Sequence, residues 1–147
     1  MDVAALRETE RFLHEQIPLT RAMQVRVENY GAGQLTLTAP LDANHNHLGT
    51  AFGGSLAALV MVTGYALLWL ELGDRTAHIV ISESALKFRQ PVRDVLRAIC
   101  LRPGQAPLAQ FKADFAANGK ARLRLEVVIE ENGETAVEFA GTYVARR

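Results

Sequence analysis

The segment AFGGSLAALVMVTGYALLWL, residues 51–70, decides the fold because it is long, apolar and uncharged. A run of this length can span a bilayer, but a membrane helix is usually flanked by basic and aromatic residues. The upstream flank is DANHNH and the downstream flank is ELGD, so basic flanks are missing. We therefore expect a helix over about 55–72 that is apolar on every side because a sheet surrounds it.

The rest of the chain contains the strands that such a sheet needs. Apolar and polar residues alternate, as is typical of half-buried strands, in segments near 23–30, 35–41, 77–89, 95–102, 123–129 and 137–143. Asn132-Gly133 is a strong hairpin signal between the last two strands. Short helices are predicted from Asp2 to about Glu15, ended by Pro18, and from Pro107 to the stop at Asn118-Gly119.

These elements predict an α+β fold in a single domain over residues 1–147. Strands joined by hairpins form a mostly antiparallel sheet, and a curved sheet can bury one long helix, with two short extra helices outside it. The chain length is that of one domain. A curved sheet with one helix also leaves an open face or edge that a second copy can cover.

The composition excludes several classes of function. Sixteen basic residues balance sixteen acidic residues, which argues against a nucleic-acid partner. Cys100 is the single cysteine, so it cannot form an internal disulfide, and we expect a buried, inert thiol. The N-terminal residues MDVAALRETERF lack the apolar core of a secretory signal. The expected location is the cytoplasm, without a membrane partner.

The segment NHNHLGTAFGGS, residues 44–55, leads directly into the long helix and is the candidate site. Gly53 and Gly54 remove side chains where the helix begins. The first turn of a helix has unpaired backbone N–H groups, whose dipoles favour negative charge. A carbonyl that becomes an oxyanion would suit such a position. The alternative is that the glycines only allow the helix to pack closely on the sheet.

The pattern Asn46-x-x-Gly49-x-x-Phe52-Gly53-Gly54, the long helix and Lys87-Phe-Arg-Gln-Pro91 together resemble the hot-dog-fold acyl thioesterases. Residues 46–56 and 64–70 resemble more closely the thioesterase family of the YiiD C-terminal type. The resemblance covers essentially the whole chain. It implies hydrolysis of an acyl thioester of coenzyme A or acyl carrier protein, with no cofactor, by a homodimer or a dimer of dimers.

The resemblance also implies roles for particular residues. The pantetheine arm would enter between two subunits, and the thioester carbonyl would face the start of the helix. Asn46 would orient the water or the carbonyl, and the amide of Gly54 or Ser55 would be the oxyanion donor. The acyl chain would lie along Phe52 and Leu56, and Gly53 would allow it to approach.

The chain departs from the family pattern at two positions. The common pattern of the hot-dog thioesterases has His where this chain has Phe52, and an acid where it has Met61, which cannot act as a base. A positioned base is worth about 10²–10⁴ in rate. Partial replacements are Thr63 and Ser55 on the helix, His45 and His47 in the loop, and Ser82, Glu83 and Ser84 on the next strand.

The missing acid keeps a second function open, a non-catalytic module that binds acyl thioesters. Glu83 could serve the site of a neighbouring subunit, or it could be an outward-facing strand residue. A hydratase of the same fold would need an acid and a His placed together, and no such pair is evident.

Two further groups of residues have alternative interpretations. His45 and His47 have the spacing of metal ligands, but no third ligand is evident, so we predict no metal and assign His47 a hydrogen bond to substrate. Positive charge follows the third strand and could hold the phosphates of coenzyme A or a carrier protein, or form a solvated face. The residues are Lys87, Arg89, Arg93 and Arg97.

Overall fold

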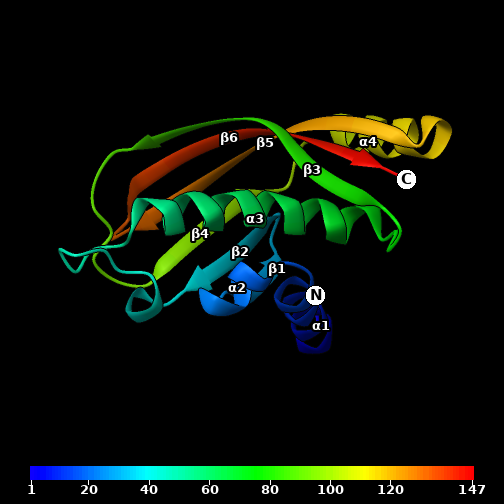
Figure 1. The fold of residues 1–147 in the computed structure, drawn as a ribbon. Helices are drawn as coiled ribbons and strands as arrows, with labels where there is room; N and C mark the ends of the chain where they lie inside the picture. Colours follow the sequence, from blue (N-terminus) through cyan, green and yellow to red (C-terminus); the bar gives the residue numbers. More distant parts are fainter.

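The computed structural model describes all 147 residues and shows a six-stranded sheet wrapped around helix α3 (Gly53–Leu72) (Figure 1). All neighbouring strands are antiparallel, in the order β1-β2-β4-β5-β6-β3. The strands are β1 (Arg26–Gly31), β2 (Gln34–Ala39), β3 (His78–Phe88), β4 (Leu96–Leu101), β5 (Lys120–Glu131) and β6 (Glu134–Arg146). The predicted α+β arrangement is confirmed.

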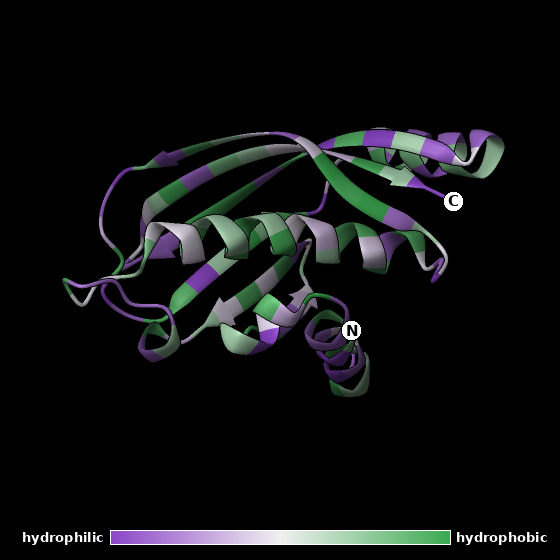
Figure 2. Cartoon of the chain, viewed as in Figure 1, coloured by the Kyte–Doolittle hydropathy of each residue, from purple (hydrophilic) through white to green (hydrophobic).

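Helix α3 is the centre of the molecule, and Figure 2 shows it mostly in green and pale colours beside a largely purple α1. Its length and composition would allow it to cross a membrane, but 56% of its most apolar 18-residue stretch is buried inside the fold. The helix begins at Gly53, two residues before the predicted start, because both glycines adopt the helical conformation of its first turn. The helix is surrounded by the sheet, as the sequence predicted.

Strand β3 lies at one edge of the sheet, beside β6, because α3 carries the chain across the sheet between β2 and β3. Its register with β6 shifts between Ile81 and Glu83, so Ser82 is an extra, bulged residue. A bulge reverses the alternation of side chains along a strand. Ile81 pairs with the buried Tyr143 on the inner face, whereas Glu83 pairs with Thr142 on the outer face.

The opposite edge, β1, is covered by helix α1 (Val3–Gln16). The Val27 amide donates to the Glu10 carboxylate at 3.0 Å, and Arg7 donates to the Val27 carbonyl. His14 Nε2 lies 2.7 Å from the Val25 carbonyl oxygen. Side chains of α1 therefore satisfy backbone groups that an edge strand usually leaves bare. No element covers the outer edge of β3 in the same way.

The remaining helices differ in part from the sequence-based expectations. Helix α2 (Pro18–Ala22) is absent from the expected elements, because Pro18 not only follows the end of α1 but also begins a new helix. The predicted strand start at Met23 is wrong because Met23 caps α2 and Gln24 has a positive φ of 58°. Helix α4 (Gln105–Asn118) starts two residues before Pro107 and packs on β5, and a 3-10 turn spans Leu41–Ala43.

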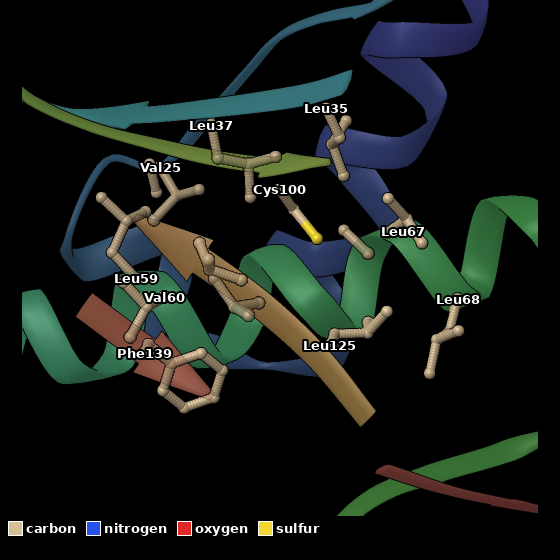
Figure 3. Close-up of a cluster of buried hydrophobic side chains, with 14 of the residues drawn as sticks. Val25, Leu35, Leu37, Leu59, Val60, Leu67, Leu68, Cys100, Leu125 and Phe139 are labelled. Atoms are coloured by element: carbon tan, nitrogen blue, oxygen red, sulfur yellow. The ribbon is translucent and has the colours of Figure 1, made fainter. Parts of the chain in front are cut away.

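One continuous apolar core fills the space between α3 and the inner face of the sheet, with α1 and α4 packed against it. Figure 3 shows Cys100 of β4 in this core, surrounded by leucine and valine side chains. Burial of the Cys100 thiol raises its pKa to about 12. The expectation of a buried, inert cysteine agrees with this position.

Candidate active site

The N-terminus of α3 presents unpaired backbone amides. The helix begins after Phe52, whose side chain gives no capping hydrogen bond. The first amide with an intrahelical partner is that of Leu56, which donates to the Phe52 carbonyl at 3.0 Å. The amides of Gly53, Gly54 and Ser55 have no partner within the chain. Such a turn favours a ligand oxygen with developing negative charge.

The loop before α3 is fixed by hydrogen bonds and holds the start of the helix in place. The buried Asn44 side chain donates to the carbonyls of Met23 at 2.9 Å and Pro40 at 2.8 Å. Its backbone carbonyl accepts from the Phe52 amide at 2.8 Å, and the Ala51 amide donates to Val92 at 2.8 Å. The direction of the first turn of α3 is therefore set by buried contacts.

Asn46 closes a turn within this loop. Its amide oxygen accepts from the backbone amides of Leu48 at 2.8 Å and Thr50 at 3.2 Å. Its amide nitrogen donates to the Thr50 hydroxyl at 2.8 Å. The side chain thus shapes the approach to the helix N-terminus, and its predicted role in orienting the reactants stays a prediction.

Two exposed aromatic rings flank the start of α3. A Cβ on Gly54 would lie 2.4 Å from Cε2 of Phe52, so the Phe52 ring packs over this glycine. A Cβ on Gly53 would lie 4.0 Å from Cε1 of Phe88, near the end of β3. Phe52 and Phe88 are 56% and 55% exposed. Phe88 was not predicted as a site residue, although an aromatic residue within Lys87-Phe-Arg was visible in the sequence.

A cavity of about 720 Å³ runs along α3 and begins one turn after Gly54. Its helical wall is the stripe Ala58, Met61, Val62 and Tyr65, whose spacing places them on one face of a helix. The rest of the lining comes from the ends of α1 and α2, the start of β3 and Tyr143: Phe12, Gln16, Ile17, Leu19, Thr20, Met23, Arg75, Thr76, Ala77, His78, Ile79, Val80, Ile81 and Tyr143.

No carboxylate lines this cavity. Met61, which occupies the position where the resembled family has an acid, faces it. Burial raises the pKa of the Tyr65 and Tyr143 phenols above their usual range, so both are protonated at neutral pH. The cavity has no local signal in the sequence because its walls come from four separate segments.

Two predicted site residues lie in the core. Thr63 is fully buried, and its hydroxyl donates to the Leu59 carbonyl at 2.6 Å. Leu56 is 4% exposed. Both therefore face the sheet, because they lie on the side of α3 opposite the stripe that forms the cavity wall. The predicted contacts of Thr63 and Leu56 with substrate do not fit this geometry.

The predicted residues of β3 are divided between the two faces of the sheet. After the bulge, Ser84 pairs with the buried Gly141 on the inner face, while Glu83 and Lys87 lie on the outer face. The outward position of Glu83 is the alternative that the sequence left open. Ser82 lies in the bulge, and its hydroxyl donates to the Thr142 carbonyl at 3.3 Å.

Two of the predicted phosphate-binding cations, Arg89 and Arg97, are paired with acids of the chain, and the loop histidines lie in the segment before α3. Arg89 is paired with Glu138 at 2.9 Å on the outer side of the sheet. His45 Nδ1 lies 2.9 Å from the Asn46 carbonyl oxygen, and His47 is exposed. No cluster of three or more metal-ligating side chains occurs in the structure.

The fold and this site define a class, the hot-dog-fold thioesterases, in which a curved antiparallel sheet surrounds one long helix. The model of the family described as "Putative thioesterase (yiiD_Cterm)" matches residues 6–147. The chain belongs to this family.

Solved structures agree with this assignment. A protein of unknown function from Chlorobaculum tepidum TLS is 30% identical, with a TM-score of 0.90 over 97% of this chain and 94% of that chain. A putative thioesterase from Shewanella oneidensis is 27% identical, with a TM-score of 0.83 over 97% of each chain. A probable thioesterase from Pseudomonas aeruginosa is 27% identical, with a TM-score of 0.80 over 95% and 94%.

Proposed function

We propose that the protein hydrolyses acyl thioesters of coenzyme A or acyl carrier protein at the N-terminus of α3, without a cofactor. The observation that supports this most strongly is the uncapped first turn at Gly53, Gly54 and Ser55. The thioester carbonyl accepts a hydrogen bond from the Gly54 or Ser55 amide. Attack by water then places negative charge on that oxygen, where the amides stabilise it.

The surroundings of this turn suit a thioester. Gly53 has room where a side chain would lie, so the thioester can approach the backbone there, whereas the Phe52 ring covers this side of Gly54. Phe52 and Phe88 flank the turn with apolar surface, and Asn46 holds the loop that leads to it. His47 and Ser55 are the polar side chains of the segment that remain candidates for contact with substrate or water.

Proline substitutions in the first turn test the donor directly. Gly54→Pro removes the proposed N–H donor, and the first turn tolerates proline because its N–H groups are unpaired. We expect a loss of about 10²–10³ in kcat for release of free thiol from acyl-CoA substrates. Gly54→Ala adds a side chain but keeps the N–H, so the difference between these two variants reports the donor together with the restriction that proline places on the helical Gly53.

Gly53→Pro is the matched control for helix geometry. Phe52 has φ −66° and ψ 133°, an extended conformation that suits a residue before proline. We expect this variant to lose less activity than Gly54→Pro, because it keeps the Gly54 and Ser55 amides, with circular dichroism confirming the fold of all three. Equal activity of the Gly54→Pro and Gly54→Ala variants would contradict the proposed role of the amide.

The proposal includes a homodimer formed through the bare edge of β3. Glu83 and Lys87 are exposed on the same face of this strand and form no salt bridge within the chain. Antiparallel pairing of two β3 strands about Ala85 places Glu83 of each copy opposite Lys87 of the other. Opposite charges in facing strand positions stabilise a pair.

A charge exchange tests this register. Lys87→Glu should weaken the dimer, and the double variant Glu83→Lys with Lys87→Glu should restore it. The measurement is sedimentation at micromolar concentration. A monomeric wild-type protein would contradict the dimer, and an unchanged Lys87→Glu dimer would contradict the register.

A second candidate function is a non-catalytic module that binds acyl thioesters. It is favoured by Met61, which places a thioether where a carboxylate would face the cavity. Calorimetric binding of acyl-CoA without any release of thiol, from either coenzyme A or carrier-protein substrates, would support this function over hydrolysis.

A further inference from the structure

The cavity along α3 has a defined far end. Arg75 lies over the Trp69 ring at 3.7 Å from its centroid, and Phe12 of α1 stacks on the same indole at 4.5 Å between centroids. Arg75 is also paired with Glu8 of α1 at 3.2 Å. Both Arg75 and Phe12 line the cavity. The far wall is therefore held by contacts between α1, the end of α3 and the loop before β3.

The helical wall of the cavity begins at Ala58, one turn after the proposed reaction site. Gly54, Ala58, Met61 and Tyr65 follow one another at intervals of four, three and four residues, so they form one stripe on α3. Ala58 lines the cavity and is one turn beyond Gly54. The shared stripe therefore directs a chain attached to a carbonyl at Gly54 toward the cavity. Thirteen of the eighteen lining residues are hydrophobic, which suits a hydrocarbon chain.

The length of this path can be compared with that of an acyl chain. From Gly54 to Trp69 the helix rises about 22 Å, at about 1.5 Å per residue. An extended chain advances about 1.2 Å per bond, since three bonds of an extended residue span roughly 3.3–3.6 Å. The path therefore matches an acyl chain of roughly 16–18 carbons before it meets the far wall.

We infer that Phe12 and Arg75 set the maximum length of the acyl chain that the protein accepts. This inference rests on the proposed function, because it takes the start of α3 as the position of the thioester. Each methylene that enters the cavity leaves water and adds about fourfold in affinity. Carbons beyond the wall stay in solvent and add little.

Binding of non-hydrolysable acyl-CoA thioethers, from 4 to about 22 carbons, tests the inference by calorimetry. We expect affinity to rise with chain length and to level off at roughly 16–18 carbons. Arg75→Ala removes part of the wall and should move the levelling point to chains at least about two carbons longer. Arg26→Ala is the matched control, because Arg26 also pairs with an acid of α1 but does not line the cavity.

A second variant tests the entrance of the cavity instead of its far wall. Ala58→Trp fills the entrance and should reduce affinity for 16-carbon thioethers by about tenfold or more, with less effect on four carbons. Leu101→Trp places the same ring on an exposed outer position as a control.

Three results would each overturn the inference. The affinity does not depend on acyl-chain length, Arg75→Ala leaves the levelling point where it is, or Ala58→Trp leaves the affinity for long chains unchanged. If Ala58→Trp dissociates a dimer but retains the affinity for long chains, the cavity is occupied by a second copy of the chain. This result would also overturn the inference. Binding with the expected levelling but without any thioester hydrolysis would contradict the hydrolase proposal and leave the length limit standing.

Discussion

The hydroxyl of Tyr143 donates a 2.6 Å hydrogen bond to the backbone carbonyl of Met61. This contact ties strand β6 to the middle of α3, and it requires Gly64. A Cβ on Gly64 would lie 2.3 Å from the Tyr143 hydroxyl oxygen and 2.6 Å from Cζ. The helix that bears the proposed site is thus locked to the sheet halfway along its length.

Gly64→Ala should therefore destabilise the fold by about 1–3 kcal/mol, because the added methyl group overpacks a buried contact. The measurement is the free energy of unfolding in urea. Gly53→Ala is the matched control on the same helix, because its Cβ would make only an ordinary contact at 4.0 Å. Equal stability of the two variants would show that the Tyr143 contact does not require the glycine.

Glu71, near the end of α3, should make stability depend on pH in the acid range. Burial of its carboxyl raises the pKa, but hydrogen bonds from Arg102, Tyr30 and Lys112 outweigh burial and lower the pKa to about 2. The side chain is 9% exposed. A lowered pKa gives stability that is present above the ordinary pKa of about 4.5 and is lost as pH falls toward about 2.

Glu71→Gln should cost about 1–2 kcal/mol at pH 7, after allowance for screening by solvent. It should also flatten the loss of unfolding free energy between pH 4.5 and 2, the range given by its pKa. Glu126→Gln is the control, because its pair with Arg124 is exposed and should change stability by less than about 0.5 kcal/mol. An unaltered acid profile in Glu71→Gln would contradict this account.

Asn46 can be tested for a role beyond the shape of its loop. Asn46→Asp keeps oxygens that accept from the Leu48 and Thr50 amides, but it removes the amide nitrogen. If that nitrogen orients the reactants, kcat should fall by about 10²-fold, a larger effect than the loss of its hydrogen bond to the Thr50 hydroxyl has on the unfolding free energy. His45→Ala, in the same loop, should keep its activity. An active Asn46→Asp protein would assign Asn46 to loop structure alone.

Met61→Glu returns a carboxylate to the wall of the cavity. We expect thiol release to rise by about tenfold or more if the missing base limits the reaction. A glutamate at this half-buried position should have a raised pKa, so the gain should grow as pH increases. Met61→Gln has nearly the same shape without the charge and should show no gain. A Met61→Glu protein no faster than Met61→Gln would show that another group already supplies this role.

Cys100 should be inert in the folded protein. Burial raises the pKa of its thiol to about 12, so almost no thiolate forms at neutral pH. A thiol reagent should label it only when the protein unfolds, at the rate of unfolding. Rapid labelling in native buffer would contradict its place in the core.

The fold followed from the sequence because its strongest signals are local. Alternation defined the strands, Asn132-Gly133 defined the last hairpin, and the uncharged segment defined α3. The bulge at Ser82 could not be predicted, since it depends on the pairing of β3 with β6, and it moved Glu83 to the outer face. The cavity was missed for the same reason, because its walls meet only after α1, α2, α3 and β3 have packed together.

The difference between the two edges of the sheet has a consequence for the N-terminal residues. Glu10 and Arg7 occupy the amide and carbonyl of Val27 in β1, and His14 contacts the Val25 carbonyl just before this strand, so α1 obstructs the β1 edge while the β3 edge is open. A chain with one such edge forms closed pairs. Loss of residues 1–16 would leave each subunit with two unpaired strand edges. Subunits could then add at both edges and form filaments. In the proposed dimer, the first helix would therefore prevent further addition of copies.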